Sequence, residues 1–360
     1  MAYRYPLLLS VLFGWLALPA QGDTLVDAQD PQQLTVADRA VLYELLRNFP
    51  AGGEAAVARI DGDTTIYYGV RRGEGRLISV DNADRAFGIG SVTKVFTATL
   101  LATLVDAGEL SLDDAVNDAY PFPFADSTII TYRQLATHTS GLPRLPSNMA
   151  GLFLSPTDPY ATYTAADLET YLREKLTLST DGQSSYSNLG FGLLGYTLSH
   201  RIATAGYAAT LRDRVLDPLG MTATSYGPDS NRAELVVGVG PEDQPAPYWH
   251  FTDAMGGAGA LVSTPRDMAR FLRAQLDTTR TALALTREAH FVVDDRQSVG
   301  LGWQILQQAP ERVIYWHNGA VGGYRAFVAL DVERQQGIVL LTNSLLMNDA
   351  VDRAGMRLLH

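Results

Sequence analysis

Residues 88–106 read Gly88-Ile89-Gly90-Ser91-Val92-Thr93-Lys94-Val95-Phe96-Thr97-Ala98-Thr99-Leu100-Leu101-Ala102-Thr103-Leu104-Val105-Asp106. After Lys94 this stretch carries no charge until Asp106, and Gly108 is a natural end for a helix. A helix without a polar face is normally buried. We therefore expect a helix from residue 91 to about residue 106 that runs through the middle of the molecule.

Strand-like segments flank this helix on both sides, near the two ends of the chain. On the N-terminal side, a helix begins at the capping-box-like Thr35-Val36-Ala37-Asp38, and residues 55–60 and 65–70 predict a hairpin. On the C-terminal side, three strands and a closing helix are expected at residues 313–316, 324–330, 337–342 and 349–359. The clearest helices between them are residues 165–176 and 191–203. The expected fold class is α+β, of the α/β sandwich type: an antiparallel sheet built from both termini, flanked by helices, with a mainly helical insertion.

The first 22 residues have the pattern of a secretory signal peptide. Arg4 provides a positive start, residues 7–18 are apolar, and Ala20-Gln21-Gly22 is a small-residue exit. The apolar run is shorter than the roughly 20 residues that a stable membrane span needs. We expect a signal peptide at residues 1–22, a secreted or periplasmic protein, and no stable membrane span after cleavage. A membrane anchor or an ordered N-terminal helix is the alternative.

Composition limits the classes of partner and cofactor. The net charge of −11 argues against nucleic acid and against an anionic membrane surface. The absence of cysteine excludes disulfides, lipidated cysteine and thiolate metal sites. The six histidines show no His-Glu-x-x-His motif or paired-ligand spacing, so neither a metal nor another cofactor is expected.

Ser91 and Lys94 form the first candidate catalytic pair. Lys94 and Lys175 are the two lysines among 28 Lys and Arg residues. A buried lysine can be tuned toward neutrality, whereas arginine stays protonated. Ser91 lies three residues before Lys94, hence on the same helix face, and the preceding glycines allow it to occupy the helix N-terminus. This spacing predicts an activated nucleophile; a serine N-cap followed by a snorkelling lysine is the alternative.

Tyr186-Ser187-Asn188 is the second motif, just before an apolar helix. A tyrosine beside a lysine can lose its proton more easily, since a nearby cation favours the phenolate. Asn188 can donate to a substrate carbonyl and accept from an ammonium group. The alternative is a capping Ser or Asn beside a core tyrosine.

His317-Asn318-Gly319 is the third motif, expected directly after the strand at residues 313–316. It precedes Ala320-Val321-Gly322-Gly323, and a glycine-rich strand edge allows a substrate backbone to pair as an added strand. Taken alone, His317 also fits an imidazole with a purely structural role.

In this order and at these separations, the three motifs resemble the signatures of the penicillin-recognising serine hydrolases. The nearest branch is the class C β-lactamase and D-alanyl-D-alanine carboxypeptidase group. Two further segments add to the resemblance, which covers the chain from about residue 35 to its end: Leu135-Ala136-Thr137-His138-Thr139-Ser140-Gly141-Leu142-Pro143 and Gly257-Ala258-Gly259-Ala260-Leu261-Val262-Ser263-Thr264-Pro265-Arg266-Asp267-Met268.

The resemblance implies a role for each matching residue. Ser91 would be the acylated nucleophile, with Lys94 and Tyr186 sharing the proton transfers; which of the two is the base in each half-reaction stays open. The substrate-binding residues would be Asn188, which orients the substrate amide, together with His317, Gly319 and Ala320. The backbone N–H groups of Ser91 and Ala320 would form the oxyanion hole.

Two histidines and an arginine need separate interpretation. His317 stands where dedicated lactamases usually carry the lysine of a Lys-Thr-Gly motif. This departure favours a peptidase or esterase over an efficient β-lactamase, and it leaves less positive charge for a substrate carboxylate. Arg325 could supply that charge, although a surface arginine is the stronger interpretation. His138 is interpreted as holding a loop.

We therefore expect an exported serine hydrolase that forms an acyl-enzyme, most like a D-alanyl-D-alanine carboxypeptidase/endopeptidase acting on peptidoglycan stem peptides. Its β-lactamase-like domain would span residues 23–360, with the sheet part at about 35–85 and 255–360 and the helical part at about 86–254. One alternative is an esterase or weak class C-like β-lactamase, with a small-molecule ester or β-lactam as substrate. Another is a non-catalytic penicillin-binding sensor module. The oligomeric state stays open.

Overall fold

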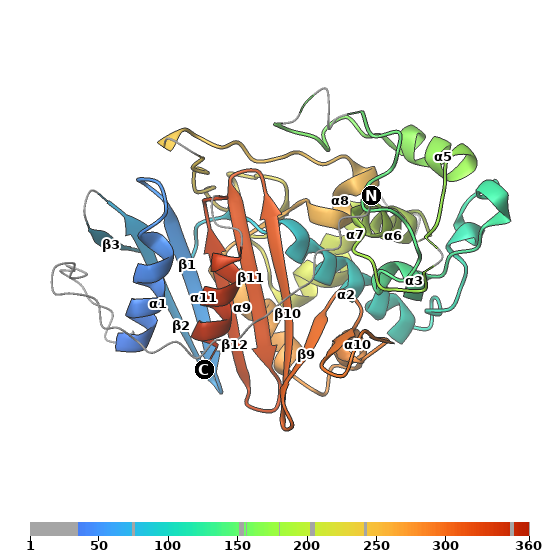
Figure 1. Ribbon diagram of the computed structural model, residues 1–360. Helices are drawn as coiled ribbons and strands as arrows, with labels where there is room; N and C mark the ends of the chain where they lie inside the picture. Colours follow the sequence, from blue (N-terminus) through green and yellow to red (C-terminus); the bar gives the residue numbers. More distant parts are fainter. Residues whose placement is uncertain are drawn as a thin grey trace.

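The computed structural model describes residues 35–73, 76–150, 155, 157–179, 181–201, 206–240, 243–345 and 349–359. The predicted signal peptide at residues 1–22 lies outside the described residues. A large antiparallel sheet with helices on both faces makes up one side of the molecule, and a mainly helical region makes up the other (Figure 1). The expected α+β fold class is thus confirmed.

The two ends of the chain join within the large sheet. Its nine strands run in the order β3-β2-β1-β12-β11-β10-β9-β8-β7, and β1 pairs antiparallel with β12. Their bounds are β1 Glu54–Asp61, β2 Thr64–Arg72, β3 Leu77–Val80, β7 Phe291–Val292, β8 Gln297–Val299, β9 Gln304–Ala309, β10 Arg312–Val321, β11 Tyr324–Asp331 and β12 Gln336–Thr342. A second sheet has the order β4-β6-β5, with β4 Phe87–Gly88, β5 Ser225–Tyr226 and β6 Leu261–Ser263.

Both faces of the central strands are apolar because helices cover both. On β12, Ile338 and Leu340 join one buried cluster, and Val339 and Leu341 join the other. Successive side chains of a strand point to opposite faces, so this unbroken apolar run fills two cores. The helices α1 (Val36–Leu46) and α11 (Ala350–Leu358) cover one face, and α9 (Pro265–Leu276) lies on the other (Figure 1).

The uncharged helix is buried as predicted. It is α2, Thr93–Asp106, and Gly108, with its positive φ of 70°, follows its end. It begins two residues later than predicted because Gly90–Val92 form a separate 3-10 turn. The remaining described α-helices are α3 Tyr132–Ala136, α5 Ala165–Glu174, α6 Asn188–Arg201, α7 Tyr207–Leu211, α8 Asp253–Gly259 and α10 Thr281–Arg287.

Two predicted boundaries need correction near the site. The strand predicted at residues 313–316 continues to Val321, so His317 and Ala320 lie within β10 and not beyond its end. Continued pairing with β11, from Tyr315 opposite Leu330 to Val321 opposite Tyr324, extends it. The helix predicted from residue 191 starts at Asn188.

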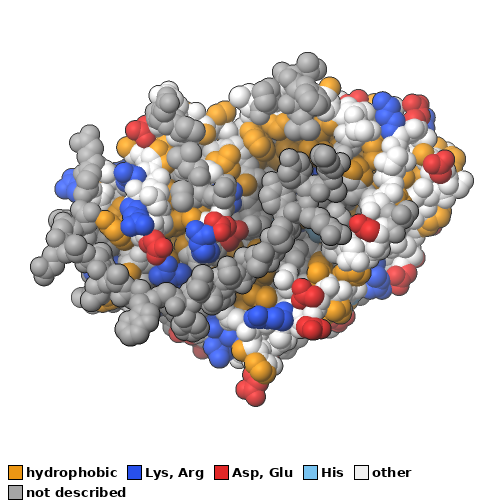
Figure 2. Space-filling view, viewed as in Figure 1, with side chains coloured by type: hydrophobic (Ala, Val, Ile, Leu, Met, Phe, Trp, Pro, Cys, Tyr) orange, Lys and Arg blue, Asp and Glu red, His pale blue; other side chains and the backbone are white. Residues whose placement is uncertain are grey.

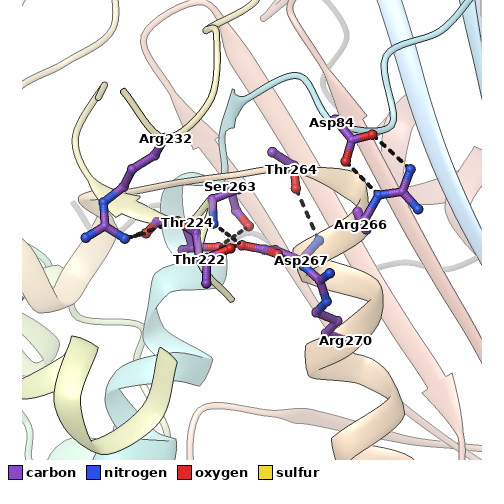
Figure 3. A network of polar contacts seen from close by, with 10 residues as sticks. Asp84, Thr222, Thr224, Arg232, Ser263, Thr264, Arg266, Asp267 and Arg270 are labelled. Atoms are coloured by element: carbon purple, nitrogen blue, oxygen red, sulfur yellow. Dashed lines mark hydrogen bonds and ion pairs between the residues drawn. The ribbon is translucent and has the colours of Figure 1, made fainter. Parts of the chain in front are cut away.

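Asp267, at the start of α9, links this helix by hydrogen bonds to the residues just before β5 of the second sheet (Figure 3). Its carboxylate is fully buried, accepts hydrogen bonds from the Thr224 hydroxyl and the Ala223 backbone, and pairs with Arg270. Buried charges are stable only when paired and hydrogen-bonded in this way. Because β6 pairs with β4, which leads into the Gly90–Val92 turn, this network helps to position Ser91.

Acidic and basic side chains lie interspersed over the described part of the face in Figure 2. Among the described helices, none is both long and apolar enough to cross a membrane.

Candidate active site

Ser91 lies in the Gly90–Val92 turn, which packs directly on the backbone of β10. Gly90 has a φ of +49°, and a Cβ there would lie 2.7 Å from the backbone of Ala320. A Cβ on Gly319 would lie 2.0 Å from the carbonyl oxygen of Ile89 and 3.0 Å from the amide nitrogen of Ser91. Only glycine permits so close an approach at these positions. The two glycines therefore bring the amide of Ser91 to the part of β10 that contains Gly319 and Ala320.

Lys94 is fully buried one helical turn after Ser91. Its Nζ lies 3.2 Å from Ser91 Oγ, 2.8 Å from Asn188 Oδ1 and 2.7 Å from the carbonyl oxygen of Ala258. The last two oxygens can only accept, so two N–H groups of the amine donate hydrogen bonds to them in either protonation state. When Lys94 is neutral, its lone pair is left for the Ser91 hydroxyl.

Burial, assisted by the positive charge of Arg144, lowers the pKa of Lys94 well below its ordinary value. Desolvation disfavours the ammonium form, and in the described part of the chain its hydrogen-bond partners include no carboxylate. The environment thus moves Lys94 toward the neutral amine that a proton acceptor requires.

The Tyr186 hydroxyl lies 2.6 Å from Ser91 Oγ, and the Lys94 ammonium lies 4.7 Å from the centre of the tyrosine ring. Burial raises the pKa of Tyr186 above its ordinary value, and the hydrogen bond to Ser91 and the charge of Arg144 offset this only in part. The expected easing of proton loss beside lysine is therefore wrong for this tyrosine, because desolvation of the phenolate outweighs the hydrogen bond to Ser91 and the charge of Arg144.

Asn188 connects the buried amine to a residue that the sequence did not single out. Its Oδ1 accepts from Lys94, and its Nδ2 donates to the Tyr160 hydroxyl at 2.9 Å. Tyr160 stacks on Phe251 with ring centres 4.6 Å apart. No periodicity or motif marked Tyr160. The Ala258 carbonyl was also missed as a contact, although its segment, residues 257–268, was recognised.

His317 is 2% exposed, and its Nδ1 lies 2.6 Å from the carbonyl oxygen of Asn318. That oxygen can only accept, so Nδ1 carries a proton. Burial first, and then the charge of Lys94, lower the pKa of His317 to about 3. Its ring centre lies 6.5 Å from that of Tyr186. His317 therefore borders the site as a neutral imidazole at physiological pH.

Arg325 does not replace the missing cation. It pairs with Ala320 across the β10–β11 ladder, three positions from Val328, which pairs with His317. Alternation along the strand puts Arg325 on the opposite face of the sheet from His317. There it lies near Asp349 and Asp352, which act on its charge.

His138 holds the Tyr186 segment, in agreement with the interpretation as a loop-holding residue. Its Nδ1 accepts from the Ser187 amide at 3.1 Å, and its carbonyl oxygen accepts from the Ser185 amide at 2.8 Å. Its ring centre lies 4.7 Å from that of Tyr186. The phenol is thereby kept in place against Ser91.

These contacts join four of the predicted residues, Ser91, Lys94, Tyr186 and Asn188, into one hydrogen-bonded cluster. Ser91 is only partly buried, whereas Lys94 behind it is closed off from solvent. A partly exposed serine and a buried amine of lowered pKa are the parts of an activated nucleophile. Within the described ranges, no group of three or more His, Cys, Asp or Glu side chains is placed to hold a metal ion.

Comparison with known proteins agrees with this geometry. Residues 44–360 match the protein family described as beta-lactamase. Penicillin-binding protein 4 of Amycolatopsis lactamdurans is 30% identical over 319 residues, which cover 81% of this chain and 80% of that protein. D-alanyl-D-alanine-carboxypeptidase/endopeptidase AmpH of Escherichia coli is 28% identical over 318 residues, 80% of this chain and 79% of AmpH. The chain belongs to the beta-lactamase family of serine hydrolases.

Solved structures share the fold. A class C beta-lactamase from Rhodobacter sphaeroides superposes with a TM-score of 0.74 over 90% of this chain and 98% of that chain, at 23% identity. A beta-lactamase/D-alanine carboxypeptidase from Pseudomonas syringae gives a TM-score of 0.75 over 89% and 97%, at 21% identity. The predicted resemblance to this family is confirmed.

Proposed function

We propose that this protein is an exported serine hydrolase that works through an acyl-enzyme on Ser91, most like a D-alanyl-D-alanine carboxypeptidase/endopeptidase acting on peptidoglycan stem peptides. The observation that carries the proposal is the position of Ser91 Oγ, 2.6 Å from the Tyr186 hydroxyl and 3.2 Å from Lys94 Nζ. The name of one relative, the D-alanyl-D-alanine-carboxypeptidase/endopeptidase AmpH, supports the choice of a peptidase. No metal or other cofactor is invoked.

In the acylation step, Ser91 Oγ attacks the substrate carbonyl carbon while its proton passes to neutral Lys94. The raised pKa of Tyr186 and the lowered pKa of Lys94 favour Lys94 as the first acceptor. The Tyr186 hydroxyl is then suited to deliver a proton to the leaving amine, and protonated Lys94 returns its proton to the Tyr186 oxygen, so that both side chains end neutral. The second half-reaction would run the same transfers in reverse, with water as the nucleophile.

Charge on the carbonyl oxygen would be stabilised by the backbone N–H groups of Ser91 and Ala320. The close approach enforced by Gly90 and Gly319 supports this pairing of the turn with β10. A substrate backbone would lie along β10, past His317 and Gly319, with Asn188 orienting the substrate amide.

Export is part of the same proposal. The signal-like residues 1–22 would be removed, leaving residues 23–360 as one β-lactamase-like hydrolase domain that acts as a secreted or periplasmic protein. Peptidoglycan peptides lie outside the cytoplasmic membrane, so the location suits the substrate.

Incubation with a labelled penicillin followed by mass spectrometry tests the proposal. We expect one adduct on the wild-type protein and none on Ser91→Ala, because the acyl bond needs the serine oxygen. Thr99→Ala is the matched control and should keep the adduct, because Thr99 is a buried residue on the same helix and its hydroxyl donates to the Val95 carbonyl. An adduct that survives Ser91→Ala would reject the assignment, and reversible binding without any adduct would favour a sensor module.

The neutral state of His317 favours an esterase as the second candidate. A site without a permanent cation at this position gives a substrate carboxylate no ionic partner there. A substrate that lacks a carboxylate therefore loses less binding free energy than one that carries it. Parallel assays with p-nitrophenyl butyrate, nitrocefin and a D-Ala-D-Ala peptide separate the three activities. Efficient turnover of nitrocefin would instead identify a β-lactamase.

A further inference from the structure

Arg144 is an exposed arginine whose backbone is tied to the candidate active site. Its carbonyl oxygen accepts from the amides of Asn188 and Leu189, at 3.0 and 3.2 Å, and so caps the first turn of α6. Its guanidinium carbon lies 5.1 Å from the centre of the Tyr186 ring. The side chain is thus anchored at its base and stacked over the residue that contacts Ser91.

The guanidinium has no carboxylate partner within the described parts of the chain. Three other arginines lie over aromatic rings in a similar way: two of them pair with carboxylates, and the third, Arg287 over Tyr315, is 8% exposed and bonds to Gln275. Arg173 lies over Phe122 and pairs with Glu169 at 3.7 Å, whereas Arg266 lies over Tyr67 and pairs with Asp84 at 2.6 Å. Arg144 is therefore a cation at the site that remains able to bind a carboxylate.

Arg144 lies on the side of the site occupied by Asn188 and Tyr160. Its backbone bonds to Asn188, whose side chain bonds to Tyr160. Burial raises the pKa of both Tyr160 and Tyr186, and the positive charge of Arg144 offsets part of each rise. In the proposed function Asn188 orients a substrate amide. The leaving half of a D-alanyl-D-alanine substrate is a single residue, so an intact amide other than the scissile one lies on the acyl half. A carboxylate bound by Arg144 would thus belong to the acyl half of the substrate, which stays on the enzyme after the first step.

We propose that Arg144 is a specificity-determining residue that binds a free carboxylate on the acyl half of the substrate, as in a peptide with an acidic group farther toward its N-terminus than the residue at the scissile bond. This inference rests on the proposed function. Arg144 would supply a cation on the acyl side of the site, whereas the neutral His317 supplies none at β10. We therefore expect a preference for acidic acyl donors over neutral donors of the same size.

Three esters test the position of the carboxylate: one carries it on the acyl half, one on the leaving half, and one carries none. Mono-p-nitrophenyl glutarate carries its carboxylate on the acyl half, p-nitrophenyl valerate is its neutral analogue, and 3-carboxyphenyl valerate carries the carboxylate on the leaving group. We expect wild-type kcat/KM to favour glutarate over p-nitrophenyl valerate. Arg144→Gln should lower the ratio of kcat/KM for glutarate to kcat/KM for p-nitrophenyl valerate by about tenfold, in keeping with a charge-assisted hydrogen bond at a partly exposed site. An effect of Arg144 through the pKa of Lys94 would change kcat/KM for all three esters alike and leave this ratio unchanged.

Two variants complete the experiment. Arg144→Lys keeps the charge but not the planar fork, so it should recover part of the preference for glutarate. Arg173→Gln, the matched control that removes an arginine stacked on a ring away from Ser91, should leave all three values unchanged.

An equal fall for all three esters in Arg144→Gln would overturn the proposal, since it would mean that Arg144 acts only through Lys94 and Tyr186. A selective fall for 3-carboxyphenyl valerate would also overturn it by placing the carboxylate site on the leaving half. Failure of the proposed function looks different: the wild-type protein would hydrolyse none of the esters, or Ser91→Ala would hydrolyse them as well, and the carboxylate site would then fall with it.

Discussion

Gly319→Ala is the substitution that should separate the position of the nucleophile from its chemistry. It adds one methyl group on β10 and leaves Ser91, Lys94 and Tyr186 in the sequence. The added Cβ would lie 2.0 Å from the Ile89 carbonyl oxygen, and Cβ atoms essentially never come closer than 3.0 Å to a neighbour. The turn and the strand must therefore separate by at least the difference, about 1 Å.

That separation sets the size of the expected effect. The second neighbour of the added Cβ is the Ser91 amide nitrogen, at 3.0 Å, so the displaced group belongs to the proposed oxyanion hole. A misplacement of about 1 Å at a reacting centre costs on the order of 100-fold in rate. Overpacking of a well-packed contact costs about 1–3 kcal/mol of unfolding free energy. We expect acylation by a labelled penicillin to slow about 100-fold, with the midpoint of thermal unfolding lowered by only a few degrees.

The assay is the second-order rate constant of acylation, measured beside thermal unfolding of the same samples. Gly337→Ala on β12 is the matched control, because its Cβ would lie 3.4 Å from Ile60 Cδ1, an ordinary contact. It should acylate at the wild-type rate. The reasoning is refuted if Gly319→Ala acylates like the wild type, or if the two variants lose activity equally.

Two further predictions concern charge. Lys94→Arg should slow acylation by about 10²- to 10⁴-fold, because arginine cannot become the neutral proton acceptor. The control variant Lys175→Arg, at the end of α5, should acylate at the wild-type rate. A fully active Lys94→Arg protein would contradict the role of the amine. The pKa of His317 is lowered from 6.5 to about 3 in the folded protein, so the unfolded chain takes up the imidazole proton first as the pH falls. The stability that depends on neutral His317 is therefore present above pH 6.5 and lost as the pH falls toward 3. Between these pH values the unfolding midpoint of the wild type should therefore fall more steeply than that of His317→Gln in thermal unfolding, and parallel curves would contradict the burial of a neutral imidazole.

Much of the fold was predictable because local patterns here agree with the tertiary structure. The uncharged run after Lys94 predicted a buried helix, since such a helix has no face for water. The capping box at Thr35 and Asp38 is present as predicted. The boundary at residue 316 was not predictable, because β10 is prolonged by pairing with β11, a contact between separate segments that no local pattern contains.

The residues of the site also fall into two groups, those that local motifs predicted and those that only the structure revealed. Residue order and spacing were enough to select Ser91, Lys94, Tyr186 and Asn188, because the motifs that carry them are local. Tyr160 and the Ala258 carbonyl escaped notice because they reach the cluster only through folding, 28 and 164 positions in sequence from Asn188 and Lys94, respectively.

The sequence by itself therefore determined which groups can do the chemistry: a serine one turn before a scarce lysine, and glycines where two backbones must meet. Only the tertiary structure decided their protonation. Burial lowers the pKa of Lys94 and His317 and raises that of Tyr186, against the expectation from a neighbouring lysine. Desolvation depends on everything that packs around a group. For Tyr186 it outweighs the opposing charge of Arg144, and for Lys94 and His317 it is the largest of the causes that lower the pKa.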